Sequence, residues 1–144
     1  MLLWQDYLPK AHFVFVDNVD SIHPKILEHV DQERVAILFE DAYDYREHEC
    51  HVRSVARLLP SGGIDFIIDD GPHTLQSQID FLRIYLPSLN KGGVAVIEDV
   101  QDVQWFASLE VEAEKAGGEF TFERVDLRHV KGRYDDLVFV VKRL

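Results

Sequence analysis

Two short apolar runs, at residues 66–68 and 94–97, each end in a pair of acidic residues. Their β-branched and aromatic side chains follow one another without polar alternation, which is typical of strands buried on both faces in a parallel sheet. The carboxyl ends of parallel strands meet at one edge of the sheet, and ligands of open α/β sheets bind outside that edge. The sequence therefore predicts a cleft faced by four acids and one histidine, namely Asp69, Asp70, Glu98, Asp99 and His73.

Carboxylates gathered at this edge would repel one another, because neighbouring strands lie only about 4.8 Å apart. A bound proton or cation relieves that repulsion, and carboxylate oxygens suit Mg²⁺, Mn²⁺ or Ca²⁺. Two other interpretations stay open. Acids at strand ends also cap the helices that follow, and a metal-dependent hydrolase would use the same carboxylates.

Composition limits the classes of partner. With 26 acidic against 15 basic residues the formal net charge is -11, so the phosphates of nucleic acids and of anionic membranes would repel the chain. A small molecule or a metal ion is the better partner. The 144 residues, 47% of them hydrophobic, are enough for a real core, and we expect residues 1–144 to form a single domain.

The cysteine content and the first residues bear on where the protein resides. Cys50 is the only cysteine, so an internal disulfide is excluded, which fits a reducing compartment. No stretch approaches the roughly 20 apolar residues that span a bilayer. The first residues lack the basic flank of a signal peptide, and we therefore expect a cytoplasmic protein.

Strand-like and helix-like segments alternate along the chain, which is typical of an α/β fold. The expected strands are residues 12–17, 35–39, 65–70, 92–99, 120–127 and 137–142. The expected helices are residues 2–8, 24–30, 45–59, 75–86 and 103–115. The short connection through Gly132 indicates that the last two strands form an antiparallel hairpin. Residues 47–51, which are rich in histidine and glutamate, are expected to be a solvated helix face rather than a metal site.

Three segments carry a resemblance to one protein family: residues 65–73, 91–99 and 135–142. Through them the chain resembles the class I S-adenosylmethionine-dependent methyltransferases, and most of all the metal-dependent sugar O-methyltransferases of the macrocin and mycinamicin type. The family usually has serine where this chain has Pro72. The resemblance implies a Rossmann-like, mostly parallel sheet flanked by helices, in which the last two strands of the chain form an antiparallel pair at one edge.

The same resemblance implies a chemistry. S-adenosylmethionine would donate a methyl group to a small hydroxylated acceptor, such as a sugar or a natural product. Asp70, Glu98 and Asp99 would match the ligands of Mg²⁺ or Mn²⁺. His73 would match the general base that takes the proton of the acceptor hydroxyl.

Two further acids follow earlier strands of the chain. Asp17 ends the first expected strand, and by the resemblance it matches the acid that holds the ribose hydroxyls of the cofactor. Asp41 follows the second expected strand and matches the acid near the adenine. Acids at strand ends are common in any α/β domain, so a structural role for both stays open.

The glycines depart from the family pattern. All eight glycines lie at or after Gly62, so no glycine-rich loop, and with it no first strand of the family fold, is present before that residue. Such a loop allows close approach of the backbone to a cofactor. Three explanations stay open: the chain is a fragment, another polypeptide or a second copy supplies the strand, or residues 66–68 close against residues 13–16. The rival to an enzyme is a non-catalytic remnant or assembly subunit that has lost the cofactor.

Overall fold

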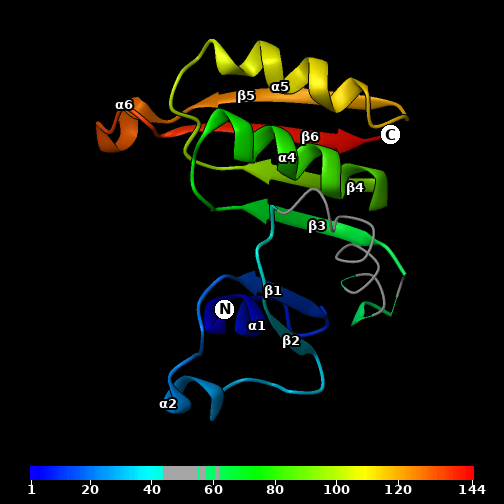
Figure 1. Ribbon diagram of the computed structural model, residues 1–144, viewed down its shortest axis with the longest axis vertical. Helices are drawn as coiled ribbons and strands as arrows, with labels where there is room; N and C mark the ends of the chain where they lie inside the picture. Colours follow the sequence, from blue (N-terminus) through cyan, green and yellow to red (C-terminus); the bar gives the residue numbers. More distant parts are fainter. Residues whose placement is uncertain (44–54, 56–57, 61) are drawn as a thin grey trace.

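The computed structural model describes residues 1–43, 55, 58–60 and 62–144, and strands and helices alternate in it as the sequence predicts (Figure 1). The described strands are β1 Phe13–Asp17, β2 Val35–Phe39, β3 Ile64–Asp69, β4 Leu89–Ile97, β5 Phe120–Asp126 and β6 Leu137–Arg143. The described helices are α1 Leu2–Tyr7, α2 Pro24–Leu27, α4 Leu75–Tyr85, α5 Trp105–Glu114 and α6 Arg128–Lys131, with the 3₁₀ turn η2 Leu86–Ser88 before β4. The helix expected at residues 45–59, with residues 47–51 in it, lies largely outside the described residues.

The described strands form two separate sheets. β1 and β2 pair in parallel, from Phe13 opposite Val35 to Asp17 opposite Phe39. The other sheet has the order β3-β4-β6-β5, in which β3 and β4 are parallel and β6 is antiparallel to both of its neighbours. The mixed α/β fold is thus confirmed, and so is the antiparallel pairing of the last two strands of the chain. The connection between β5 and β6 carries the short helix α6 rather than a tight turn.

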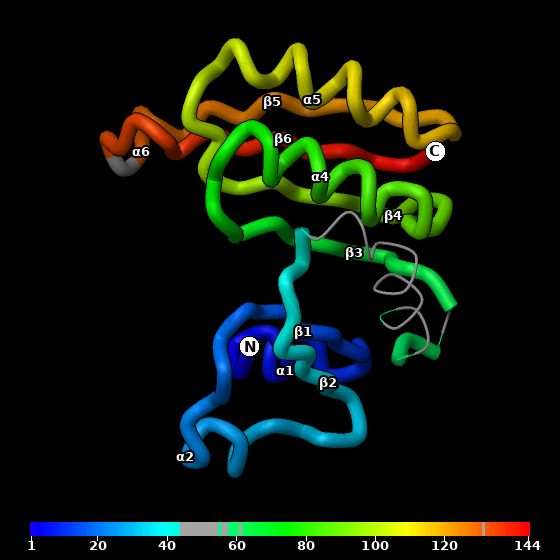
Figure 2. The backbone as a smooth tube through the Cα atoms, viewed as in Figure 1, coloured from blue at the N-terminus to red at the C-terminus, as the bar shows by residue number. Residues whose placement is uncertain are grey.

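β1 and β3 do not pair with each other, so each has one edge that is hydrogen-bonded to no described strand. Figure 2 shows β1 and β2 on the side of β3 that faces away from β4. The expected closure of residues 66–68 against residues 13–16 is therefore wrong. A cavity of about 1120 Å³, lined by residues of both strands, lies there instead.

Aromatic side chains connect the part of the chain that contains β1 and β2 to β3 and α4. Trp4 of α1 packs against Phe66 of β3, with ring centroids 6.1 Å apart. Near the end of β3, the hydroxyl group of Tyr43 donates a hydrogen bond to the carboxylate of Asp69. The hydroxyl group of Tyr85 donates a hydrogen bond to the main-chain carbonyl of Ala42 at 3.1 Å. These contacts join the two parts without pairing β1 to β3, which would require a strand separation of about 4.8 Å.

The core lies on the face of the four-stranded sheet that α4 and α5 cover (Figure 1). Alternate residues of β4 and β6 point into it: Ala95, Ile97, Phe139 and Val141 are fully buried. Ile97 is the last residue of β4 and faces this core. The two acids that follow it therefore lie at the carboxyl end of the strand. No described helix is both long enough and apolar enough to cross a membrane.

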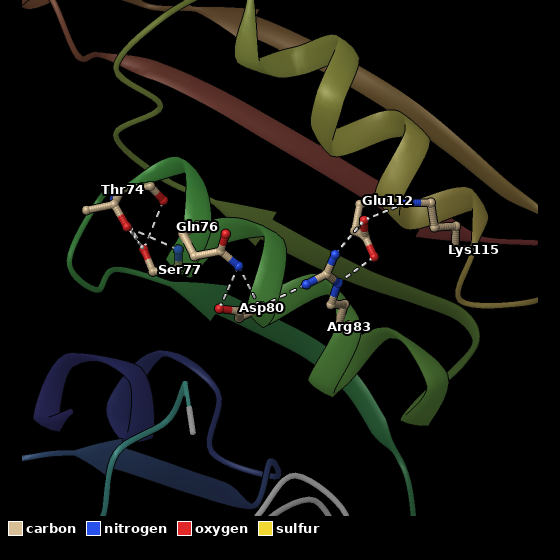
Figure 3. Close-up of polar contacts among 7 residues, drawn as sticks. All are labelled: Thr74, Gln76, Ser77, Asp80, Arg83, Glu112 and Lys115. Carbon is tan, nitrogen blue, oxygen red and sulfur yellow. Dashed lines mark hydrogen bonds and ion pairs between the residues drawn. The ribbon is translucent and has the colours of Figure 1, made fainter. Parts of the chain in front are cut away.

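Polar side chains fix helix α4 at both ends (Figure 3). At its start, Thr74 and Ser77 form a capping box, with Ser77 N donating to Thr74 Oγ1 at 3.1 Å and Thr74 N to Ser77 Oγ at 3.2 Å. At its other end, Arg83 Nε donates to Glu112 Oε1 of α5 at 2.7 Å, and Lys115 Nζ lies 3.0 Å from Glu112 Oε2. Glu112 is buried, and its contact with Arg83 joins α4 to α5.

We expect Glu112→Gln to lower the free energy of unfolding by about 1.5–3 kcal/mol at neutral pH, because hydrogen bonds to a charged group are lost. Arg83, and then Lys115, lower the pKa of Glu112 below its ordinary value of 4.5. The stabilisation is therefore present above pH 4.5 and is lost as the pH falls below it, so the difference from wild type should shrink in acid. Urea denaturation measures both effects. Glu114→Gln, at an exposed position of the same helix, should change stability by less than about 0.5 kcal/mol, and equal losses in the two variants would contradict the assignment.

Candidate functional site

The carboxyl ends of β3 and β4 bring one histidine and two aspartates together. The two strands are parallel and Asp69 pairs with Ile97, so the residues that follow leave the sheet side by side. One side-chain atom each of Asp70, His73 and Asp99 lies within 4.8 Å of the other two. His73 Nε2 is 3.4 Å from Asp70 Oδ1, and His73 Nδ1 is 3.9 Å from Asp99 Oδ2. Three of the residues singled out from the sequence thus form one cluster.

His73 and Asp99 both have a left-handed backbone conformation, with φ values of 52° and 50°. In the described part of the chain they are the only residues other than glycine with positive φ. This conformation is uncommon for a residue with a Cβ atom, although aspartate and histidine adopt it more readily than most, and such residues cluster at functional sites. The sequence offers only a weak signal of it, since His73 follows the turn dipeptide Gly71-Pro72 and aspartate and histidine tolerate positive φ.

The donor atoms of the cluster fit a divalent cation. His73 Nε2 is buried and has no hydrogen-bond partner among the described residues, although two carboxylates lie beside the ring. The side chain of Asp70 is 71% exposed, so room for water or a substrate oxygen remains next to it. Carboxylate oxygens with open positions suit Mg²⁺ or Mn²⁺.

The other aspartate of the first pair, Asp69, is buried and is not part of the cluster. It is only 4% exposed, and it accepts the hydrogen bond from the hydroxyl group of Tyr43. Burial raises the pKa of Asp69 to about 6, even though the Tyr43 hydrogen bond lowers it. Burial and the neighbouring Asp69 raise the pKa of Tyr43, so its hydroxyl group stays a donor. Adjacent residues of a strand face opposite sides, which is why Asp69 is structural where Asp70 is accessible.

Glu98 is not among the residues whose ligand atoms meet in the cluster. Its main chain is held on two sides: its amide donates to the carbonyl of Asp69 at 3.1 Å, and its carbonyl accepts from Gln78 Nε2 at 3.4 Å. Glu98 does line the cavity between β1 and β3, together with Asp70. Its role as a ligand stays a prediction.

Asp17 and Asp41 lie on the opposite side of that cavity from β3. Asp17 is the last residue of β1, and Asp41 lies two residues beyond the end of β2, so both stand at the carboxyl ends of the parallel pair. Both side chains are exposed and both line the cavity. The structure thus brings the carboxylates predicted for the cofactor and two of those predicted for the metal to the borders of one cavity.

No family model matches the chain. Among curated proteins, an 8-demethyl-8-alpha-L-rhamnosyl tetracenomycin-C 2'-O-methyltransferase of Streptomyces olivaceus is 28% identical over 103 residues, which are 72% of this chain and 24% of that protein. Among solved structures, the MycE methyltransferase of the mycinamycin biosynthetic pathway, in complex with Mg, SAH and mycinamycin VI, superposes with a TM-score of 0.62. The match has 19% sequence identity and covers 98% of this chain and 38% of MycE. This chain has a methyltransferase fold.

This chain corresponds to only part of each of these proteins. The chain spans about a quarter of the S. olivaceus relative and less than two fifths of MycE. The Methanococcus jannaschii fibrillarin pre-rRNA processing protein also matches, with a TM-score of 0.53, 19% identity, and coverage of 94% of this chain and 57% of that one. This chain shares its fold with both solved structures.

Two side chains beside the cluster in this methyltransferase fold were not found from the sequence. Tyr43 follows β2 and reaches Asp69 across the cavity. Gln78 is fully buried on α4 and reaches the main chain of Glu98. A buried glutamine among the apolar positions of an amphipathic helix is the kind of local inconsistency that marks such a residue, since amides are seldom buried without a specific partner.

Proposed function

We propose that this chain is the core of an S-adenosylmethionine-dependent O-methyltransferase in which Mg²⁺ or Mn²⁺ assists methyl transfer to a hydroxyl group of a small molecule. The observation that carries the proposal is the cluster of Asp70, His73 and Asp99 at the carboxyl edge of a methyltransferase fold. Acids and a histidine at this edge are placed to meet a ligand that binds outside the strand ends. The left-handed backbone at two of the three residues supports a role in binding or chemistry.

In this proposal the metal is held by carboxylates and His73 moves the proton. Asp70 and Asp99, with Glu98 beside them, offer the hard oxygen ligands that Mg²⁺ prefers, whereas imidazole suits it less well. A bound cation would lower the pKa of the acceptor hydroxyl group. His73 accepts the proton of that hydroxyl group as the bond between oxygen and the methyl carbon forms and the bond between sulfur and the methyl carbon breaks. S-adenosylhomocysteine and the methyl ether are the products.

Asp17 and Asp41 would position the cofactor. Asp17 would accept hydrogen bonds from the two ribose hydroxyl groups, and Asp41 would lie near the adenine. Their exposed carboxylates, on the border of the cavity that Asp70 also lines, support this assignment. Methyl transfer gains its rate mainly from such positioning, because donor and acceptor must meet in line.

A small hydroxylated acceptor, a sugar or another natural product, is the substrate class we propose. The S. olivaceus relative is named as a rhamnosyl tetracenomycin 2'-O-methyltransferase, and the MycE structure is a complex with mycinamycin VI, which supports this substrate class. The net charge of -11 argues against an RNA substrate, despite the likeness to fibrillarin. Electron paramagnetic resonance of Mn²⁺ titrated into the chain tests the proposal directly. Saturable binding at one site supports it, and the absence of binding contradicts the metal-assisted mechanism.

The open edges of β1 and β3 support a further part of the proposal: another polypeptide segment, from a partner chain or a second copy, completes the sheet between them. Unpaired strand edges invite pairing with another strand, and both edges border a cavity that is larger than a typical ligand pocket of roughly 300–1,000 Å³. Such a segment would also supply backbone amides close to the cofactor, which no glycine before Gly62 provides.

We therefore expect the isolated chain to bind S-adenosylhomocysteine only weakly, with a dissociation constant above roughly 1 mM, since contacts from Asp17 and Asp41 alone rarely offset the entropy of fixing a flexible ligand. Equilibrium dialysis with labelled ligand measures the affinity, and sedimentation velocity in the same buffer reports the oligomeric state. Micromolar binding by a monomer would contradict the need for a further strand. Metal binding without any cofactor binding, in every assembly state, would favour the non-catalytic remnant.

A further inference from the structure

We infer that Gln78 is a positioning residue that holds the main chain on one side of Asp99 and so aims its carboxylate at the metal site; this rests on the proposed function. Gln78 lies on α4 and is 0% exposed. Its Nε2 donates to the carbonyl oxygen of Glu98 at 3.4 Å.

The backbone around Asp99 explains why that contact matters. The two dihedral angles of Asp99 are set by the peptide plane before it and the peptide plane after it. The plane after it is held by the sheet, because the amide of Val100 donates to the carbonyl of Leu137 at 2.9 Å. The plane before it contains the carbonyl of Glu98, which Gln78 holds. Asp99 therefore keeps its left-handed φ of 50° between two fixed planes, one of which depends on a side chain.

The burial of Gln78 also supports its role as a positioning residue. Its Oε1 is buried and has no hydrogen-bond partner among the described residues. A buried amide oxygen without a donor is unfavourable, and an apolar side chain of the same length would pack at this position without that penalty. Stability of the core therefore does not account for glutamine here, whereas the donor to Glu98 does.

Helix α4 also links the two halves of the cluster. The capping box of Thr74 and Ser77 begins the helix directly after His73, and Gln78 lies one turn further along the same helix. One rigid helix thus sets the position of His73 at its start and, through Gln78, that of Asp99 on the next strand. This arrangement keeps His73 Nδ1 at 3.9 Å from Asp99 Oδ2.

The test is Gln78→Met, which keeps the length of the side chain and removes the donor. Amide hydrogen exchange of the metal-free chain should become about tenfold faster at Asp99 and Val100 relative to the core amide of Ile97, while the melting temperature stays within about 2 °C or rises. Mn²⁺ affinity, measured by electron paramagnetic resonance, should fall about 10- to 100-fold, as it does when partners of metal ligands are removed.

Gln76→Met is the matched control, because Gln76 is an exposed glutamine of the same helix that bonds only to Asp80 in the described residues. It should change neither measurement. Unchanged relative exchange in Gln78→Met would overturn the inference, and so would a chain that no longer unfolds cooperatively, since Gln78 would then be a core residue. A wild-type chain that binds no Mn²⁺ would contradict the proposed function, while the exchange data would still decide whether Gln78 holds Asp99.

Discussion

Asp70→Asn and Asp99→Asn should each weaken Mn²⁺ binding by about 100-fold or more. Each change removes one negative charge and one strong oxygen ligand from the cluster, and even the partners of metal ligands typically contribute 10- to 100-fold. Asparagine is the best replacement at Asp99, because it tolerates the left-handed backbone that this residue adopts. Electron paramagnetic resonance or calorimetric titration gives the dissociation constants.

Two further variants sharpen this experiment. Asp20→Asn, at an exposed position outside the cluster, removes one negative charge just as the two aspartate variants do, and it should leave the affinity unchanged. Glu98→Gln decides whether Glu98 belongs to the ligand set, which its place outside the cluster leaves as a prediction. Removing an acid should leave the metal-free fold as stable as before or stabilise it, since repulsion between like charges is relieved. Unchanged Mn²⁺ binding in both aspartate variants would favour the alternative that the acids only cap the helices that follow the strands.

In the assembled, active enzyme, His73→Asn should lower turnover by about 10²- to 10⁴-fold, the usual contribution of a general base. Asparagine keeps the left-handed conformation at φ 52° accessible, so the turn before Thr74 should survive the change. The acceptor's binding constant should change little, because the proton is transferred only in the reaction step. Single-turnover methyl transfer and acceptor binding, measured separately, distinguish the two effects.

The metal affinity of the same variant tells the two possible roles of His73 apart. A base leaves Mn²⁺ binding within a few-fold of wild type, whereas a ligand would weaken it as strongly as Asp70→Asn does. The distances of His73 from Asp70 and Asp99 allow either role. Near-normal turnover in His73→Asn would leave the metal as the only activator of the hydroxyl group and make His73 a structural residue of the turn.

Much of the sheet was predictable because its signals are local. The runs of β-branched residues mark β1 to β4, and the expected bounds differ from the observed strands by a few residues at most outside β4, which begins earlier, at Leu89. Thr74, a residue type that favours helix N-caps, caps α4. The acids Asp70 and Asp99 were assigned to one edge because the strands were expected to be parallel, and β3 and β4 are.

The sequence by itself determined which segments are strands and which acids follow them, because alternation, apolar runs and caps depend on neighbours in the chain. Only the tertiary structure decided that β1 and β3 stay apart, that Asp69 turns inward to Tyr43, and that Gln78 reaches the main chain beside Asp99. These contacts join residues far apart in the chain, so no local pattern encodes them. The same holds for the left-handed backbone of Asp99, since contacts from α4 and β6, rather than its own side chain, fix the peptide planes on either side of it.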